Sequence, residues 1–449
     1  MNAKSYDIVV VGGGTTGCCA AVAAAECGAS VLLVEKLPFL GGNMTGGLPW
    51  LGFHDKQTHK QVVDGLPAKI IAQLQKVGGA TEFVYDPITG SAVGVNGNML
   101  KLVIEKMVLE TGAEILLHSL AVSLEERGSK KLLGISTKGG MVYAQAKVVI
   151  DCTDSADVAA LAGAVLTVGR EPDHRRQVSS YVETFGGIDF EEMLEYFKGN
   201  SDQIRPFPLS ENVRAALLAQ MQTAPVWILG AFEKRIAQAK NAGSTYERKQ
   251  LIGVAYPSVK ELMLVSSRVE DVDLNDAAKH TAAELEGFQQ TWEILSLLNN
   301  YIPGCRNAYL VSTGAQLGIR ESRHVKGDYL LTADDLLEAR PFEDAVCCGA
   351  YHMDIHSPDH NGLETKQPPI YRIPYRSLLV AGTENLLVAG RCISATHEAM
   401  SSTRVAPISA AEGEAAGVAA ALAVRRRECV RELPTEILQG ELLRRNVIF

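Results

Sequence analysis

The stretch Asp7-Ile-Val-Val-Val-Gly-Gly-Gly-Thr-Thr-Gly17 decides the fold that we expect for this chain of 449 residues. The apolar, β-branched run Tyr6–Val11 predicts a buried strand, which the glycines end. Thr15–Cys27 is built of small, helix-compatible residues, and Gly28 follows where a helix commonly stops. Ser30–Val34 predicts a second strand. Strand, glycine turn, helix and strand in this order form the repeating unit of a parallel sheet.

The glycines of this stretch fit the pattern G-x-G-x-x-G, and Glu35 ends the second strand 23 residues after Gly12. In this setting the pattern indicates dinucleotide binding, although a glycine-rich turn without a ligand is the alternative. Gly12 permits the tight turn, Gly14 lets the backbone approach a pyrophosphate, and Gly17 allows the helix to pack closely. The helix N-terminus offers free N–H groups to phosphate. Glu35 can accept hydrogen bonds from both ribose hydroxyls, and it would repel a 2′-phosphate.

Charge, hydropathy and cysteine usage exclude several classes of protein. The formal net charge is −9, which argues against nucleic acid as a main partner. The apolar run near the N-terminus and the Ala-rich stretch 410–424 are too short or too polar for a signal peptide or a membrane span. The nine cysteines contain no C-x-x-C pair, and they fit free thiols in a reducing compartment. We therefore expect a cytoplasmic protein that binds neither nucleic acid nor a membrane.

Further stretches of the chain carry a resemblance to a known family. These are Gly41-Gly42, Arg372-Ile-Pro-Tyr-Arg-Ser-Leu-Leu379, Asn385-Leu-Leu-Val-Ala-Gly-Arg-Cys-Ile-Ser-Ala-Thr-His-Glu-Ala399, Gly318–Tyr329 and Tyr351–Pro358. Together with the N-terminal pattern they resemble the FAD-dependent oxidoreductase family, a group of glutathione-reductase-like flavoproteins near the fumarate reductase branch. The resemblance covers most of the chain and is weakest at about 185–300. Its motifs are specific for FAD and unspecific for the substrate.

The expected fold class is α/β: a Rossmann-like FAD-binding domain, with three layers around a parallel sheet, and an inserted α+β substrate or cap domain. The middle of the chain is richer in charged and aromatic residues. The C-terminal part again resembles the N-terminal part in composition, with an apolar strand predicted at 385–389 and a long helix rich in Ala and Gly at 407–427. We place the two parts of the FAD-binding domain at 1–167 and 372–449, and the cap domain at 168–371.

Three features favour FAD over NAD as the nucleotide. The chain has one fingerprint, a second glycine cluster at 41–47, and a glycine-containing C-terminal strand and helix that an elongated cofactor needs. No cysteine pair follows Gly42, so disulfide reduction is not expected. No histidine lies between Gly41 and Pro49, where fumarate reductase relatives attach the flavin, so the FAD is expected to be noncovalent.

The resemblance also implies roles for particular residues. Residues 36, 42 and 43 would lie along the ribose and pyrophosphate, the backbone of Val122 would bond the adenine, and residues 390 and 391 would approach the flavin. The helix that starts near Pro407 would point its N-terminus at the flavin O2/N1 edge. The expected cofactor-binding residues are Gly12, Gly14, Thr15, Thr16, Gly17, Glu35, Lys36, Gly42, Asn43, Val122, Gly390 and Arg391.

One segment departs from the family pattern. Residues 151–157 read Asp-Cys-Thr-Asp-Ser-Ala-Asp where the family usually has D-A-T-G-D-G-D. Asp154 and Ala156 therefore replace glycines, and the close approach of this backbone to the cofactor is put in question.

Candidate catalytic residues follow the C-terminal motif. His397 is our candidate acid–base group because the ordinary pKa of histidine lies near neutrality, and Arg404 is our candidate clamp for a substrate carboxylate. The alternatives are that His397 caps the loop and that Arg404 contacts FAD itself.

Two more polar groups stand out in the sequence. His352, Asp354 and His356 alternate, so on a strand they face one side. We expect His352 and His356 to line the substrate pocket rather than to bind a metal, and we assign no metal. Residues 320, 321 and 323 form a charged cluster that we interpret as a salt-bridge network at a domain interface.

These observations predict an FAD-dependent oxidoreductase that transfers a hydride between a small organic substrate and flavin N5. The electron donor or acceptor is unknown, and a homo-oligomer is possible. Two alternatives stay open, which are a nucleotide-binding regulatory protein without turnover and an NAD-dependent dehydrogenase.

Overall fold

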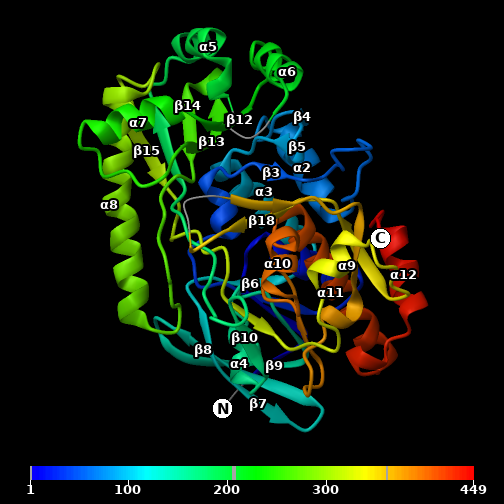
Figure 1. Cartoon of the computed structure of the whole chain (residues 1–449). Helices are drawn as coiled ribbons and strands as arrows, with labels where there is room; N and C mark the ends of the chain where they lie inside the picture. Colours follow the sequence, from blue (N-terminus) through cyan, green and yellow to red (C-terminus); the bar gives the residue numbers. More distant parts are fainter. Residues whose placement is uncertain (1–2, 205–208, 360–362) are drawn as a thin grey trace.

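The computed structural model describes residues 3–204, 209–359 and 363–449, and its centre is a seven-stranded sheet (Figure 1). The strands, in spatial order, are β6 (Glu114–Leu116), β2 (Val31–Val34), β1 (Lys4–Val11), β9 (Gly140–Asp151), β8 (Lys130–Thr137) and β7 (Leu120–Arg127), with β21 (Leu386–Val388) beside the end of β9. Five of them run parallel, because β6, β2, β1, β9 and β21 pair in parallel register. β7 and β8 extend the sheet antiparallel along the first part of β9.

Two helices with small side chains pack together on this sheet. They are α1 (Thr15–Glu26) and α11 (Ala406–Arg426), from opposite ends of the sequence. A Cβ on Gly413 would collide with the carbonyl oxygen of Thr16, and a Cβ on Gly417 with that of Ala20. The glycines and alanines of the C-terminal helix therefore permit a close helix–helix approach, which brings both helix N-termini to one side of the sheet.

The remaining elements of the first part pack around these helices. They are the 3-10 turn η1 (Gly42–Gly46), α2 (Leu66–Lys76), α3 (Gly97–Glu110), and the small antiparallel sheet of β3 (Trp50–Leu51), β5 (Gly90–Val93) and β4 (Val84–Asp86). α4 (Asp157–Leu161) follows β9. All nine cysteines are free thiols, and seven of them are buried.

A second, antiparallel sheet forms the cap. Its spatial order is β12 (Trp227–Ala231), β13 (Leu251–Tyr256), β14 (Glu261–Leu264), β11 (Glu183–Gly186) and β15 (Tyr309–Thr313). The helices that accompany it are α5 (Phe190–Gly199), α6 (Glu211–Met221), α7 (Glu233–Asn241) and α8 (Ala277–Tyr301). One face of the sheet packs its apolar side chains against these helices in a core of its own. In Figure 1 the cap occupies the upper left of the view, and the C-terminal end of the chain lies on the other side.

The chain then returns to the first core. Residues 325–353 and 371–389 contribute side chains to the same apolar core as β1 and α11. The elements of this part are β16 (Arg323–Val325), which pairs with β10 (Leu166–Val168), α9 (Ala333–Leu337), β17 (Ala345–Gly349) with β20 (Tyr371–Pro374), β18 (Met353–His356) with β19 (Leu363–Lys366), α10 (His397–Thr403) and α12 (Thr435–Arg444).

The expected fold class is confirmed, with a parallel nucleotide-binding sheet between helices and an inserted α+β cap. The division at residues 168 and 371 stays a prediction, since the cap sheet spans 183–313 and the segment after it packs into the first core. Within the described residues, no helix is both long and apolar enough to cross a membrane.

Candidate functional site

A cavity of about 210 Å³ opens where β1 and β2 end. Gly12 adopts a φ of +100°, and a Cβ there would collide with the carbonyl oxygen of Cys152. A Cβ on Gly17 would collide with the carbonyl oxygen of Gly12, so the helix can approach the turn only without a side chain. In contrast, a Cβ on Gly14 would meet no atom within 4 Å, because Gly14 borders the open cavity. The three glycines thus occupy the positions that the fingerprint assigns to them.

The N-terminus of α1 faces this cavity without a cap. Gly14 is the N-cap residue, no side chain caps it, and no acidic residue lies in the first turn. Thr15 and Thr16 also line the cavity. The free N–H groups and the positive end of the helix dipole therefore offer a site for phosphate.

Glu35 closes the side of the cavity at the end of β2. It is 5% exposed, and its two carboxylate oxygens accept hydrogen bonds from the backbone N–H groups of Gly13 and Leu37. Burial raises the pKa of Glu35 above its ordinary value, although these two hydrogen bonds oppose the shift. Glu35 is therefore held in one orientation in the lining, next to Lys36.

The loop between β6 and β7 forms the far end of the cavity, through Ser119, Leu120 and Ala121. Val122 is 38% exposed and lies outside the residues that line the cavity. The register of β7 against β8 shifts between Ala121 and Ser123, so the backbone is irregular at this position. An adenine contact through Val122 stays a prediction.

The second glycine cluster lies directly beside the first. The backbone N–H of Gly41 donates to the carbonyl oxygen of Gly13 at 2.8 Å, and Gly42 lines the cavity with a φ of +56°. Asn43 donates through Nδ2 to the carbonyl oxygen of Leu317 at 3.3 Å, while its Oδ1 is buried and has no hydrogen-bond partner among the described residues. An orphaned buried acceptor in the lining fits a site that a hydrogen-bonding ligand completes.

The segment that departs from the family pattern keeps a glycine-like backbone. Asp154 has a φ of +70° and Ala156 a φ of +54°, although neither is glycine. Both residues therefore adopt the left-handed conformation that glycine favours, while the approach of this backbone to the cofactor stays in question. Asp154 lines the cavity and pairs with Arg391 at 2.9 Å between Oδ1 and Nη2.

The C-terminal part of the chain supplies the opposite wall. The N–H of Gly390 donates to Glu412 at 2.9 Å, and Arg391 donates to the carbonyl oxygens of Asp154 and Ile319. α11 begins at Ala406 with no side-chain cap and no acidic residue in its first turn, and Ala406 lines the cavity. One cavity therefore meets two uncapped helix N-termini, which suits a ligand with negative charge at two places.

A second cavity, of about 360 Å³, adjoins the first under the cap sheet. The linings of both cavities include Asn43, Met44, Arg391, Arg404 and Ala406. Its volume lies in the range of small-molecule pockets. The two cavities therefore meet at the start of α11.

His352, Asp354 and His356 all line this second cavity, as the alternation predicts. Asp354 accepts from Arg404 Nη2 at 3.1 Å, lies 3.3 Å from Nε2 of His356, and lies 3.9 Å from Nε2 of His352. Burial would raise the pKa of Asp354, but His356 and Arg404 hold it far below its ordinary value. Burial lowers the pKa of both histidines, that of His356 to about 3, so they are neutral near pH 7.

Arg404 lies where the two cavities meet, and its charge already has a partner in Asp354. Arg320 differs. It lines the second cavity, donates to the carbonyl oxygen of Val178 at 2.7 Å and to Ser180 Oγ at 2.8 Å, and has no carboxylate within 4.0 Å among the described residues. Sequence reasoning placed Arg320 in a structural network and so missed it as a pocket residue.

The rest of that charged cluster is structural, as interpreted. Arg323 pairs with Asp157. Glu321 is 1% exposed and accepts from the N–H of Gln177 at 2.9 Å, and its Oε2 lies 2.7 Å from Nδ1 of His397. Burial would raise the pKa of Glu321, but hydrogen bonds with His324 and His397 lower it to about 2.

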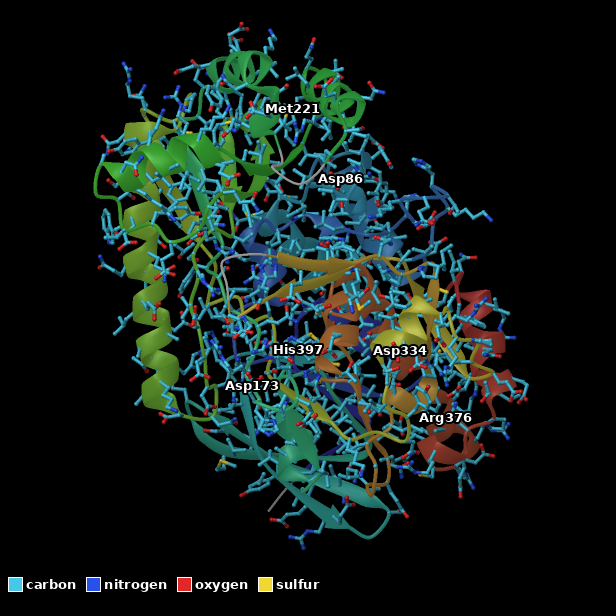
Figure 2. All side chains as sticks on the ribbon, viewed as in Figure 1. Asp86, Asp173, Met221, Asp334, Arg376 and His397 are labelled. Carbon is cyan, nitrogen blue, oxygen red and sulfur yellow. The ribbon has the colours of Figure 1, made fainter. Side chains whose placement is uncertain are left out.

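His397 is 5% exposed and is the first residue of α10, in the interior of the molecule (Figure 2). It contacts Glu321 and lies outside the residues that line the two cavities. Its role as an acid–base group stays a prediction, and the geometry favours a residue that positions the loop before α10.

Comparison with known proteins decides the family. The model of the FAD-dependent oxidoreductase family matches residues 7–442. This chain belongs to that family. FAD is therefore its cofactor, and the first cavity is the place with the chemistry to hold it. A comparison of its sequence with curated proteins gives no match.

Comparison with solved structures gives similarities of low identity and low TM-score. p-Nitrophenol 4-monooxygenase PnpA from Pseudomonas putida is 9% identical, with a TM-score of 0.47 over 98% of this chain and 84% of that one. For the anhydrotetracycline hydroxylase OxyS from Streptomyces rimosus the identity is 11% and the TM-score 0.47, over 98% of this chain and 66% of that one. For glycine oxidase from Geobacillus kaustophilus the identity is 12% and the TM-score 0.43, over 95% of this chain and 96% of that one.

Proposed function

We propose that this FAD-dependent oxidoreductase transfers a hydride between FAD held in the first cavity and a small organic substrate held in the second. The observation that carries the proposal is that the two cavities share five lining residues, among them Ala406, the first residue of α11. When bound, FAD supplies a hydride acceptor or donor at N5. A substrate in the second cavity would lie against the same wall as the end of the cofactor.

Residues of this chain have distinct tasks in that arrangement. The N-terminus of α1 binds the pyrophosphate, and Glu35 accepts hydrogen bonds from the adenosine ribose. The uncapped N-terminus of α11 stabilises negative charge at the neighbouring end of the cavity. Residues 42, 43, 390 and 391 border the space between these two ends.

The second cavity would orient the substrate between two unlike walls. Its cap side is apolar, whereas its floor carries Arg404, His352 and His356. Arg404 stands at the junction with its charge balanced by Asp354, so it is placed to contact both cofactor and substrate. The free thiols agree with work in a cytoplasmic, reducing compartment.

The test is reduction of bound flavin without oxygen. We expect purified protein to be yellow with one FAD per chain, and a screen of small organic substrates to bleach the blue absorbance band. In the variant Ile228→Trp the new ring would fill the second cavity, so FAD should stay bound and dithionite should still bleach it, while the substrate should not. Leu285→Trp, on the exposed face of α8, is the matched control and should behave like the wild type.

Two results would contradict the proposal. A flavin that no substrate reduces and that no acceptor reoxidises after photoreduction would favour the regulatory alternative. If a substrate still reduces the flavin of the Ile228→Trp variant, the substrate binds elsewhere.

A further inference from the structure

Two arginines near the second cavity lack a carboxylate partner: Arg320, which is half-buried and lines the cavity, and Arg248, which is buried and lies outside the lining. Arg320 and Arg248 both donate to Ser180 Oγ, at 2.8 and 3.2 Å. Their other acceptors are carbonyl oxygens, that of Val178 for Arg320 and that of Ser267 for Arg248. In the described part of the chain, neither guanidinium has a carboxylate within 4.0 Å. Burial is the main cause that lowers the pKa of both groups.

The nearby acidic groups do not balance these charges. Asp354 is the carboxylate of the cavity lining on this side, and it is already bound by Arg404 and by His356. Glu183 lies behind the sheet face, and burial raises its pKa to about 8, so it is mostly protonated near pH 7. Arg320 therefore lines the cavity without a carboxylate of its own, and Arg248 adds a second unpaired positive charge next to it through the shared Ser180. A positive charge that is partly removed from water and has no carboxylate partner destabilises the protein, and an anionic ligand would relieve this cost.

The opposite side of the same cavity is apolar. Ile228, Ile252, Val254 and Met263 line it from three neighbouring strands of the cap sheet, and Val265 lines it just after the last of these strands. Ile228 pairs with Val254, and Val254 pairs with Met263, so these side chains project from one face. The other face of the sheet is covered by the cap helices. A ligand here therefore meets cations at one end and a hydrocarbon surface at the other.

We infer that the second cavity takes an organic carboxylate with an extended apolar body, its carboxylate on Arg320 and its body over the cap sheet. The inference rests on the proposed function, because it names the substrate class of that cavity. A guanidinium matches the two oxygens of a carboxylate, and the apolar wall excludes a short, strongly hydrated anion as the best ligand. The positive excess excludes amines.

The experiment measures binding to the FAD-loaded protein by calorimetry, with octanoate, octan-1-ol, octylammonium and acetate as probes. We expect octanoate to bind more tightly than each of the others by at least ~10-fold, which is about 1.4 kcal/mol. Arg320→Gln should remove the preference for octanoate over octan-1-ol, whereas Arg320→Lys should keep part of it. Arg323→Gln is the matched control, since Arg323 pairs with Asp157 and lies outside both linings.

Ile252→Asn tests the apolar wall. This variant should bind octanoate more weakly and bind acetate as the wild type does, because acetate is too short to reach the cap sheet. FAD content and thermal unfolding show whether each variant is folded. If Arg320→Gln does not fold, the four probes on wild-type protein still decide the matter.

Equal binding of octanoate and octan-1-ol to the wild type would overturn the inference, as would an Arg320→Gln protein that keeps the preference. The proposed function fails in a different way. If octanoate binds as described and no substrate reduces the flavin, hydride transfer is refuted while the ligand class stands. If uncharged substrates reduce the flavin and carboxylates do not bind, the ligand class is refuted while hydride transfer stands.

Discussion

The two cavities differ in what they are made of. The first is built largely of backbone, with glycines where side chains do not fit and two helix N-termini that present free N–H groups. The second is built of side chains, with arginines and histidines at one end and the residues of a sheet face at the other. A site made of backbone is fixed by short local patterns, whereas a site made of side chains depends on which distant segments the fold brings together.

The first prediction separates two kinds of glycine within the backbone-built cavity, and it has the largest expected effect. Gly17→Ala places a methyl group against the carbonyl oxygen of Gly12, so we expect little folded protein and no bound FAD. In Gly14→Ala the methyl group meets no protein atom and extends into the cavity. We expect the unfolding free energy of the apoprotein to fall by less than about 1 kcal/mol and FAD affinity to fall at least ~10-fold.

Thermal unfolding of apoprotein and a titration with FAD give the two quantities separately. If Gly14→Ala binds FAD like the wild type, the cofactor does not approach this helix, and the first cavity does not bind it through the backbone. Gly199→Ala, at the end of α5 with open space around it, is the control for an added methyl group far from the site.

The second prediction concerns Glu321, which lies in neither lining. The pKa of Glu321 is lowered from 4.5 to about 2 in the folded protein. The ionised form therefore stabilises the fold above pH 4.5, and this contribution is lost as the pH falls from 4.5 towards 2. Glu321→Gln should lower the unfolding free energy at pH 7 by on the order of 3 kcal/mol, at about 1.4 kcal/mol per unit of pKa. Denaturant unfolding at several pH values should show the difference between the two proteins closing below pH 4.5.

His397→Asn tests whether this network also takes part in the chemistry. We expect the variant to be less stable by about 1–3 kcal/mol, since Glu321 loses a buried partner. The pH profile of flavin reduction should keep its shape, because His397 is outside both linings. A loss of ~100-fold or more in the rate of reduction, together with the loss of one limb of the profile, would instead assign the acid–base role to His397.

The sequence predicted the first cavity because its signals are local. Residues 12–17, 35 and 42–43 lie within one short stretch, and the structure brings them around one opening. Val122 lies outside this lining, next to an irregularity in β7, and its contact with the adenine stays a prediction. A bulge of this kind has no reliable signature in a single sequence.

The second cavity could be predicted only in part. The alternation of His352 and His356 placed both on one face, and both line the cavity. Arg320 was missed because the sequence cannot show that Arg320 faces only neutral acceptors while its neighbour Glu321 turns to His397. The sequence carries no periodic signal for this difference, because Arg320 lies at a bend before β16 rather than in a strand. The apolar wall comes from cap strands whose two faces are both apolar, and it became visible only once the helices were placed on one face.

The smallest expected effect concerns Asp154, whose side chain lines the cavity that is otherwise formed largely by backbone. Its φ of +70° suits glycine, and its carboxylate lines a cavity in which two uncapped helix N-termini favour anions. Asp154→Gly should therefore raise FAD affinity by ~2-fold to ~5-fold, under about 1 kcal/mol, because the partly exposed charge is screened. Asp154→Asn keeps the side chain and removes the charge. If both variants gain equally in an FAD titration, electrostatic repulsion is the cause. If only Asp154→Gly raises FAD affinity, the cause is the backbone conformation. If neither variant raises FAD affinity, the ion pair between Asp154 and Arg391 already neutralises the carboxylate.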